Sequence, residues 1–124
     1  MIKKVRRGEI WLVNWNPGRG SEQQGFRPAV IVQTDAANLN PNYPNTIVVA
    51  ISTKGKPVPF HIIVEPSLQN GLKKRSYIKA EQLLTISKER LVKCIGLLEK
   101  EVMFQLEEAI KMVLELTYTE IIRN

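Results

Sequence analysis

Short apolar segments rich in β-branched residues alternate with polar or glycine-containing segments over the first 98 residues of the chain. Segments of this kind favour β-strands, and the glycines, prolines and asparagines between them favour turns. The polar segment 35–45, with its two prolines, is expected to be a loop, and Ser87 is expected to cap one helical turn. The pattern predicts strands at residues 9–15, 27–33, 46–51, 60–64, 76–79, 83–86 and 92–98.

The end of the chain has a different period. Its apolar residues recur at spacings of three and four, which predicts a helix with one apolar stripe. Six or seven short strands followed by one helix predict an α+β, mainly β protein: a small curled antiparallel sheet or barrel, with the helix covering one mouth or face. Residues 1–124 are expected to form a single domain. The stripe consists of Val102, Met103, Leu106, Ala109, Ile110, Val113 and Leu114.

Charge is unevenly distributed along the chain. The net charge is +6, but residues 99–124 carry six acidic and three basic groups, so that residues 1–98 carry a net charge of +9. A basic body favours a polyanionic partner, and nucleic acid is the first candidate, although a solvated basic surface explains the charge equally well. The sequence contains neither an apolar run that could span a membrane nor a signal peptide, so we expect a cytoplasmic protein.

The chain has one cysteine and one histidine. Cys94 lies in a predicted strand and is expected to be a small buried apolar residue. His61 is not accompanied by the cluster of cysteine, histidine or carboxylate residues that a zinc site needs. We therefore expect no metal site, no cofactor and no internal disulfide.

Arginine, hydroxyl and carboxylate side chains stand at the ends of predicted strands. Arg27 follows a glycine-punctuated polar loop and precedes an apolar run, a common position for a working side chain on a rigid strand. Ser52 and Thr53 end another strand and could bind a phosphate together with Lys54. For each of these, a solvated strand end is the alternative.

Two further segments carry charge. Alternation places Lys79 and Glu81 on the same side of a strand, where the pair could act as acid and base or form a surface ion pair. The basic cluster 73–75 could attract phosphates without reading sequence.

This set of groups suits the cleavage of RNA without a metal ion. The RNA supplies its own nucleophile, the 2′-hydroxyl, and the enzyme needs a base, an acid and donors for the charged phosphorane. A pair of histidines would be the usual acid and base. With one histidine in this chain, arginine and carboxylate side chains would have to serve.

Several segments, in order and at matching spacing, resemble the MazF/PemK-like toxins of bacterial toxin–antitoxin systems over about residues 6–117. Arg7–Val13 resembles the first strand of that family, and residues 20–28, which end in Arg27 and Pro28, resemble its signature loop. Val49–Thr53 resembles its third-strand segment, and Glu81-Gln82 resembles an Asp-Gln position.

The resemblance implies an SH3-like β-barrel, as in CcdB-type and MazF-type toxins, with a C-terminal helix. It implies a homodimer whose groove binds single-stranded RNA and cleaves it at a short sequence without a metal, in several members leaving a 2′,3′-cyclic phosphate and a 5′-hydroxyl. The partners it implies are mRNA, a separate acidic antitoxin whose flexible tail blocks the groove, and operator DNA only in complex with that antitoxin.

The resemblance also assigns roles to residues. Arg27 falls on the catalytic arginine, and Ser52 falls on a position usually held by a catalytic threonine, a role that Thr53 could share. Glu81 falls on an aspartate proposed as a base in one branch, and Lys79 on an arginine proposed as an acid. The expected RNA contacts are Ser21, Glu22, Gln23, Lys54, Lys56, Lys79 and Gln82.

Two other functions fit a protein of this fold, because a fold does not dictate function. One is a CcdB-like toxin that binds DNA gyrase through its last residues, although residues 117–124 lack the ending expected of such a toxin. The other is a non-catalytic nucleic-acid-binding barrel. Incubation with a long single-stranded RNA in EDTA separates these from an RNA endonuclease.

Overall fold

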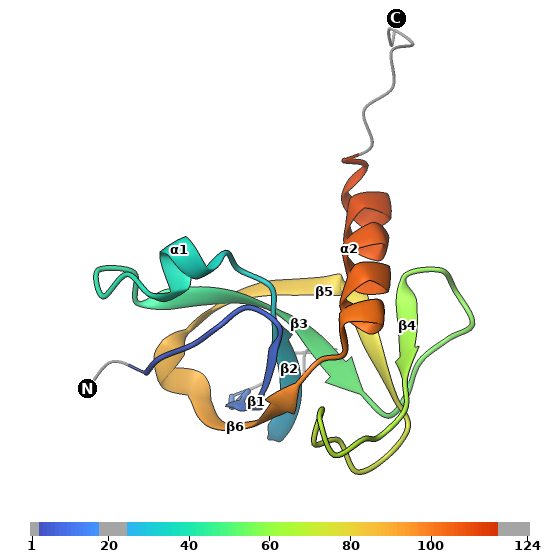
Figure 1. Ribbon diagram of the computed structural model, residues 1–124, viewed down its shortest axis with the longest axis horizontal. Helices are drawn as coiled ribbons and strands as arrows, with labels where there is room; N and C mark the ends of the chain where they lie inside the picture. The colour runs from blue at the N-terminus through green and yellow to red at the C-terminus, as the bar shows by residue number, and fades with distance from the viewer. Residues whose placement is uncertain (1–2, 18–24, 117–124) are drawn as a thin grey trace, which may run out of the picture.

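The computed structural model describes residues 3–17 and 25–116, which form one curled antiparallel sheet with a helix standing beside it (Figure 1). The strand order is β4-β5-β3-β2-β1-β6. The elements are β1 (Glu9–Asn14), β2 (Phe26–Ile31), α1 (Asp35–Asn38), β3 (Asn45–Ser52), β4 (His61–Val64), β5 (Ser76–Ser87), the 3-10 turn η1 (Lys88–Arg90), β6 (Leu91–Leu97) and α2 (Lys100–Leu114).

The predicted fold class is confirmed. All strand pairs are antiparallel, β3 is an interior strand, and α2 lies against β4 and β5 (Figure 1). The sheet is curled rather than closed, because β4 and β6 remain as its two edges. The predicted helical turn is also present, and the Ser87 hydroxyl accepts a hydrogen bond from the backbone N–H of Glu89 at 3.2 Å.

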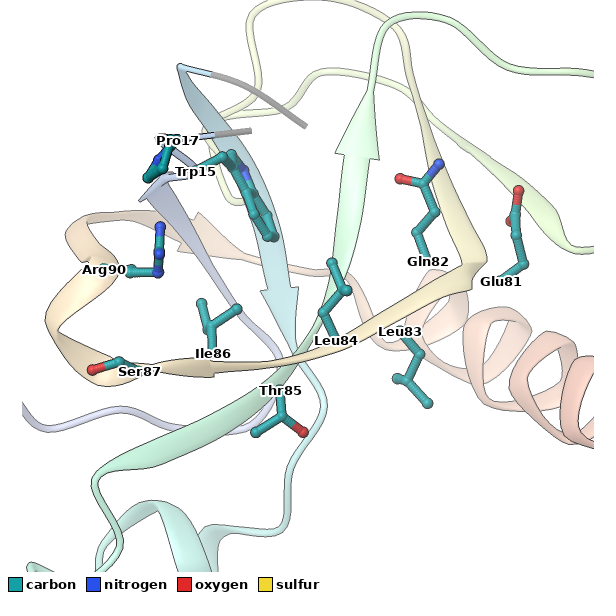
Figure 2. Close-up of a pocket in the computed structure, with 10 residues that line it drawn as sticks. All are labelled: Trp15, Pro17, Glu81, Gln82, Leu83, Leu84, Thr85, Ile86, Ser87 and Arg90. Atoms are coloured by element: carbon teal, nitrogen blue, oxygen red, sulfur yellow. The ribbon is translucent and has the colours of Figure 1, made fainter. Parts of the chain in front are cut away.

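The prediction of two short strands at 76–79 and 83–86 was wrong, because both belong to the single strand β5. The first half of β5 pairs with β4, and its second half pairs with β3. Between the pairs Ile51↔Ile78 and Val49↔Leu83, four residues of β5 face one residue of β3. Such a bulge bends a strand, and Figure 2 shows the sharp bend at Glu81 and Gln82. The polar segment that interrupts the apolar pattern is therefore a corner of the sheet and not a gap in it.

The segment predicted as a loop after β2 contains the short helix α1, so that prediction was wrong in part. The Asp35 carboxylate accepts hydrogen bonds from the backbone N–H of Arg7 at 2.6 Å and from the Asn38 side chain at 3.1 Å. The bond from the Arg7 backbone is the main reason why the pKa of Asp35 lies below its ordinary value. The buried Asn38 also accepts a hydrogen bond from the Thr46 hydroxyl at 2.8 Å. Contacts with residues remote in the chain thus stabilise a helix that composition does not reveal.

Both faces of the central strands are buried. Alternation along β2 and β3 directs Val30 and Val49 into the core that lies under α2. Ala29 and Ala50 point to the opposite side, into a second core that contains Trp15. The site described below begins on this same face of β2 and β3, beyond Ala29 and Ala50.

Cys94 is exposed, which contradicts its prediction as a buried residue. It lies in β6, an edge strand that pairs only with β1, and the neighbouring Val92 and Lys93 are exposed as well. Within the described residues, no helix has the length and apolar character needed to cross a membrane.

Candidate active site

Arg27 and Ser52 lie on the same face of neighbouring strands. Ala29 of β2 pairs with Ala50 of β3, and both side chains enter the second core. Arg27 and Ser52 each lie two residues further toward the same end of the sheet, so alternation gives them the same face as the two alanines. The Arg27 side chain is exposed there and Ser52 is partly buried. The structure therefore places on one face of the sheet a guanidinium and a hydroxyl that the sequence separates by 24 residues.

The backbone around Arg27 is held by the adjacent strand β1. Arg27 pairs with Val13, and its carbonyl oxygen accepts a hydrogen bond from the indole N–H of Trp15 at 3.2 Å. Trp15 is itself buried in the second core, and its backbone N–H donates to the carbonyl of Gly25 at 2.9 Å. A packed strand pair thus positions the base of the arginine side chain.

Side-chain hydrogen bonds hold the two ends of the β1–β2 connection together. One guanidinium nitrogen of Arg90 donates to the carbonyl oxygens of Asn14 and Asn16, at 3.0 and 2.9 Å. The side-chain oxygen of Asn16 accepts a hydrogen bond from the backbone N–H of Gly25 at 3.0 Å. The predicted RNA contacts Ser21, Glu22 and Gln23 fall between these closed ends and lie outside the described residues.

The Ser52 hydroxyl is oriented by the turn that follows β3. Its oxygen accepts a hydrogen bond from the backbone N–H of Lys54 at 3.1 Å, which leaves the hydroxyl proton for a bound group. Thr53 and Lys54 are exposed beyond the strand. Gly55 then packs so closely against the ring of Tyr77 that a Cβ atom at this position would overlap the ring. The loop that carries Lys54 and Lys56 is therefore packed onto β5.

The pairing of β3, β5 and β4 extends the same face across the sheet. Ser52 is paired with Tyr77, and the hairpin of β4 and β5 pairs Ile63 with Tyr77 and His61 with Lys79. Directly opposed residues of paired strands share a face. Lys79 and His61 consequently lie on the same side of the sheet as Ser52.

Glu81 is bound to a residue that the sequence analysis did not place in the site. Its Oε2 atom lies 2.7 Å from Nε2 of His61, while Nδ1 of His61 accepts the backbone N–H of Lys56 at 3.0 Å. A ring nitrogen that accepts a hydrogen bond carries no proton, so the neutral ring carries its proton on Nε2 and donates it to Glu81. The His61 side chain is 5% exposed and the Glu81 side chain 37% exposed. A substrate can therefore reach the carboxylate but not the imidazole.

The contact between His61 and Glu81 follows from the register of one hairpin. The hairpin of β4 and β5 pairs His61 with Lys79, and Glu81 lies two residues further along β5. Diagonal neighbours in a sheet are within reach of long side chains. A single histidine in a predicted strand does not indicate how that strand pairs, so the contact could not be predicted without the register of β4 against β5.

A hollow of about 440 Å³ adjoins Glu81 and Gln82 on the concave side of β5 (Figure 2). Leu84 and Ile86 point from β5 toward Trp15, whereas Leu83 and Thr85 point to the other side of the strand (Figure 2). The wall of the hollow is apolar around Trp15, Leu84 and Ile86, and Glu81, Gln82, Ser87 and Arg90 add polar groups to it. Its lining residues are Trp15, Pro17, Glu81, Gln82, Leu83, Leu84, Thr85, Ile86, Ser87 and Arg90.

The basic cluster 73–75 precedes β5, at the end of the strand remote from the bend. Arg75 forms an exposed ion pair with Glu65 at 3.2 Å, and Lys73 and Lys74 are exposed. The described residues contain no group of three or more histidine, cysteine or carboxylate side chains placed to hold a metal ion. What the face offers to a ligand is a guanidinium, a hydroxyl, a carboxylate and several ammonium groups, a set that can bind a phosphodiester and move a proton beside it.

Comparison with known proteins gives a consistent result. Residues 6–114 match the family described as PemK-like, MazF-like toxin of type II toxin-antitoxin system. The chain is 38% identical over 116 residues to Endoribonuclease MazF9 of Mycobacterium tuberculosis, covering 90% of this chain and 98% of that protein. It is 36% identical over 115 residues to Endoribonuclease MazF of Staphylococcus epidermidis, covering 90% and 92%. Its fold is similar to that of a mycobacterial endoribonuclease solved in complex with its cognate antitoxin, with a TM-score of 0.75, 21% identity and coverage of 93% and 99%.

Proposed function

Because this chain belongs to the PemK-like, MazF-like family of type II toxins, we propose that it cuts single-stranded RNA at the face that carries Arg27, Ser52 and Glu81. It is an RNA-cleaving toxin that an antitoxin neutralises, as the names and complexes of its relatives indicate. The position of the site and the course of the reaction are our proposal.

The proposed reaction uses the nucleophile of the substrate. The 2′-oxygen of the RNA attacks the adjacent phosphorus, and its proton passes to the Glu81 carboxylate. The Arg27 guanidinium and the Ser52 hydroxyl donate hydrogen bonds to the phosphorane oxygens. The bond between phosphorus and the 5′-oxygen then breaks, and Lys79 supplies the proton that this oxygen needs. The products are a 2′,3′-cyclic phosphate and a 5′-hydroxyl, and no metal ion takes part.

One observation carries this proposal: Arg27 and Ser52 lie on the same face of paired strands, two residues beyond the pair Ala29↔Ala50. The exposed carboxylate of Glu81 stands on a neighbouring strand, at the bend of β5. The hollow beside Gln82 is large enough for a nucleobase, and its apolar wall favours stacking of a base. We assign base contacts to Ser21, Glu22, Gln23 and Gln82, and phosphate contacts to Lys54 and Lys56.

The direct test is incubation of the purified protein with a long single-stranded RNA in EDTA. We expect cleavage at a short recurring sequence, with 5′-hydroxyl ends that a polynucleotide kinase labels without prior phosphatase treatment. The same RNA with 2′-O-methyl groups at the cleavage site should stay intact, because it lacks the nucleophile. Inhibition of gyrase without RNA scission would support the CcdB-like alternative, and RNA binding without scission would support the non-catalytic barrel.

Two neighbouring hydroxyls allow a matched comparison. Replacing Ser52 with alanine is expected to lower kcat about tenfold to a hundredfold, the usual effect of losing a hydrogen bond to a charged group. Thr53→Ala is expected to change kcat less than about threefold, because the hydroxyl that the turn orients belongs to Ser52. Single-turnover cleavage of a short RNA measures both variants. The opposite ranking would assign the working hydroxyl to Thr53.

Further properties extend the proposal to partners and location. We propose a homodimer, an acidic antitoxin that binds the basic face, and operator DNA binding only as a complex with that antitoxin. The net charge of +9 over residues 1–98 supports attraction of both RNA and an acidic peptide. We propose the cytoplasm as the site of action, where mRNA is available. The limits 1–124 of a single domain also remain a prediction.

A further inference from the structure

We propose that His61 is a positioning residue that fixes the Glu81 carboxylate and the loop after β3 relative to each other. The inference rests on the proposed function, because Glu81 is there the group that accepts the 2′-proton. His61 itself does not touch RNA, since its side chain is almost fully buried. Its effect on cleavage is exerted through the two groups that its ring nitrogens hold.

The ring of His61 is fixed from several directions. Its backbone pairs with Lys79 in the hairpin of β4 and β5. Nδ1 accepts the backbone N–H of Lys56 at 3.0 Å, and Nε2 donates to Glu81 at 2.7 Å. The ring of Phe60 meets the imidazole edge-on, with centroids 5.4 Å apart and an interplanar angle of 87°. A buried ring held in this way offers Glu81 one hydrogen-bonding direction.

Glu81 needs such a partner because of its place in the fold. It stands at the bend of β5, where one residue of β3 faces four of β5, so the regular ladder does not hold this part of the strand. A glutamate side chain has three rotatable bonds, and most of its freedom would persist at an exposed corner. The hydrogen bond to His61 selects one orientation and leaves the carboxylate accessible. A base that is held in place before the substrate binds transfers a proton more efficiently.

The hydrogen bond at Nδ1 of His61 connects the ring to the loop that orients the Ser52 hydroxyl. Lys56, which donates to Nδ1, lies two residues after Lys54, whose N–H donates to the Ser52 hydroxyl oxygen. Between them, Gly55 lies flat on the ring of Tyr77. A three-residue segment thus connects the imidazole that holds Glu81 to the oxygen of Ser52. One buried ring thereby couples the proposed base to the proposed phosphate ligands.

Two substitutions separate the two bonds. His61→Gln places an amide N–H near the position of Nε2 and keeps the donor to Glu81, but it removes the acceptor for Lys56. His61→Asn places its amide oxygen near the position of Nδ1 and keeps that acceptor, but it removes the donor. We expect His61→Gln to retain kcat within about threefold and to raise KM about tenfold, because the lysine loop loses its anchor. We expect His61→Asn to lower kcat about tenfold or more with KM little changed.

A double variant tests the route through Glu81. Glu81→Gln alone should lower kcat about a hundredfold, the ordinary contribution of a general base. Adding His61→Asn to Glu81→Gln should lower kcat no further, because the group that His61 positions is already inactive. Additive losses, or wild-type kcat and KM in both folded single variants, would overturn the proposal. Thermal melts of each variant check that it is folded.

A nuclear magnetic resonance measurement tests the contacts without any RNA. His61 is the sole histidine of the sequence, so its ring nitrogens give one pair of 15N signals. We expect the neutral tautomer with the proton on Nε2, and slow hydrogen exchange of the Lys56 amide that becomes fast in His61→Gln. A proton on Nδ1, or fast exchange of that amide in the wild type, would refute the role of His61. A protein with the expected signals that cuts no RNA would refute the proposed function instead.

Discussion

Replacing Arg27 with alanine is expected to lower kcat/KM for RNA cleavage about a thousandfold while the protein remains folded. Negative charge grows on the phosphoryl oxygens as the 2′-oxygen attacks, and removal of one oxyanion donor typically costs about 10² to 10³ in rate. Arg27 offers a charged and bidentate donor, so its loss is expected to reach the upper part of that range. The side chain is exposed, so its removal leaves the two cores untouched.

Single-turnover cleavage of a short RNA that contains the preferred sequence measures this effect, and circular dichroism with a thermal melt measures the fold. Arg27→Lys keeps the charge and loses the fork of donors, and it should fall between the wild type and alanine. Arg75→Ala is the matched control, since it removes an exposed arginine that is paired with Glu65 outside the site. We expect its rate to stay within about threefold of the wild type. A folded Arg27→Ala protein that cleaves normally would refute the proposed chemistry.

Replacing Gly71 with alanine is expected to destabilise the protein by about 4 kcal/mol, and so to lower Tm by about 10 to 20 °C. Gly71 has φ of +71°, a conformation that costs other residues about 1–3 kcal/mol. In addition, a Cβ atom there would overlap the backbone carbonyl oxygen of Ile95 in β6. The backbone of a paired strand cannot move aside as the end of a flexible side chain can, so the segment around Gly71 or the strand β6 must shift.

Gly25 provides the control for this prediction. Its φ is +73°, nearly the same as that of Gly71, but a Cβ atom there would meet no atom of the described residues within 4 Å. Gly25→Ala should therefore cost only the conformational part, about 1–2 kcal/mol. Chemical denaturation of both variants gives the two free energies of unfolding. Equal losses would mean that the close approach of Gly71 to β6 contributes nothing.

The neighbourhood of Gly71 explains why its displacement should be costly. The adjacent Asn70 is fully buried, and its amide donates to Glu99 at 3.1 Å, while Ser67 donates to the same carboxylate at 2.5 Å. Burial raises the pKa of Glu99, but the hydrogen bonds from Ser67, from Asn70 and from the backbone N–H of Glu99 itself together lower it further, so the net pKa lies below its ordinary value. A shift of Gly71 therefore disturbs the junction between β6 and the start of α2.

Much of the fold could be predicted because the spacing of apolar residues within a short segment indicates whether that segment forms a strand or a helix. Val48 and Val49 lie within an uninterrupted apolar run, which is typical of an interior strand that is buried on both faces. The apolar stripe of α2 could be found in the same way, and Leu106 and Ala109 are buried. The continuity of β5 could not be predicted, because its bend contains polar residues and the two halves of the strand pair with different neighbours.

The residues of the candidate site also fall into those that a local pattern predicts and those that depend on strand pairing. Arg27 and Ser52 could be selected because each stands where an apolar strand begins or ends, a property that the sequence displays. Their common face depends only on alternation once β2 and β3 are paired. The contact between His61 and Glu81 depends on the register of β4 against β5 and on the bulge in β5, neither of which has a local signal. A lone histidine in a strand looks like an ordinary core residue until both are known.

The closed base of the β1–β2 connection has a consequence for how this toxin can diversify. Arg90, Asn16 and Gly25 close the two ends with hydrogen bonds that use no atom of residues 18–24. The enclosed stretch can therefore be exchanged for that of a relative without breaking any of those bonds, while the strand that presents Arg27 stays in register. On the proposed assignment of base contacts to Ser21, Glu22 and Gln23, recognition of the RNA sequence and cleavage of the RNA would then depend on different segments of the chain. A chimaera carrying a foreign stretch between Pro17 and Gly25 is a route to a ribonuclease with a new cleavage sequence and unchanged chemistry.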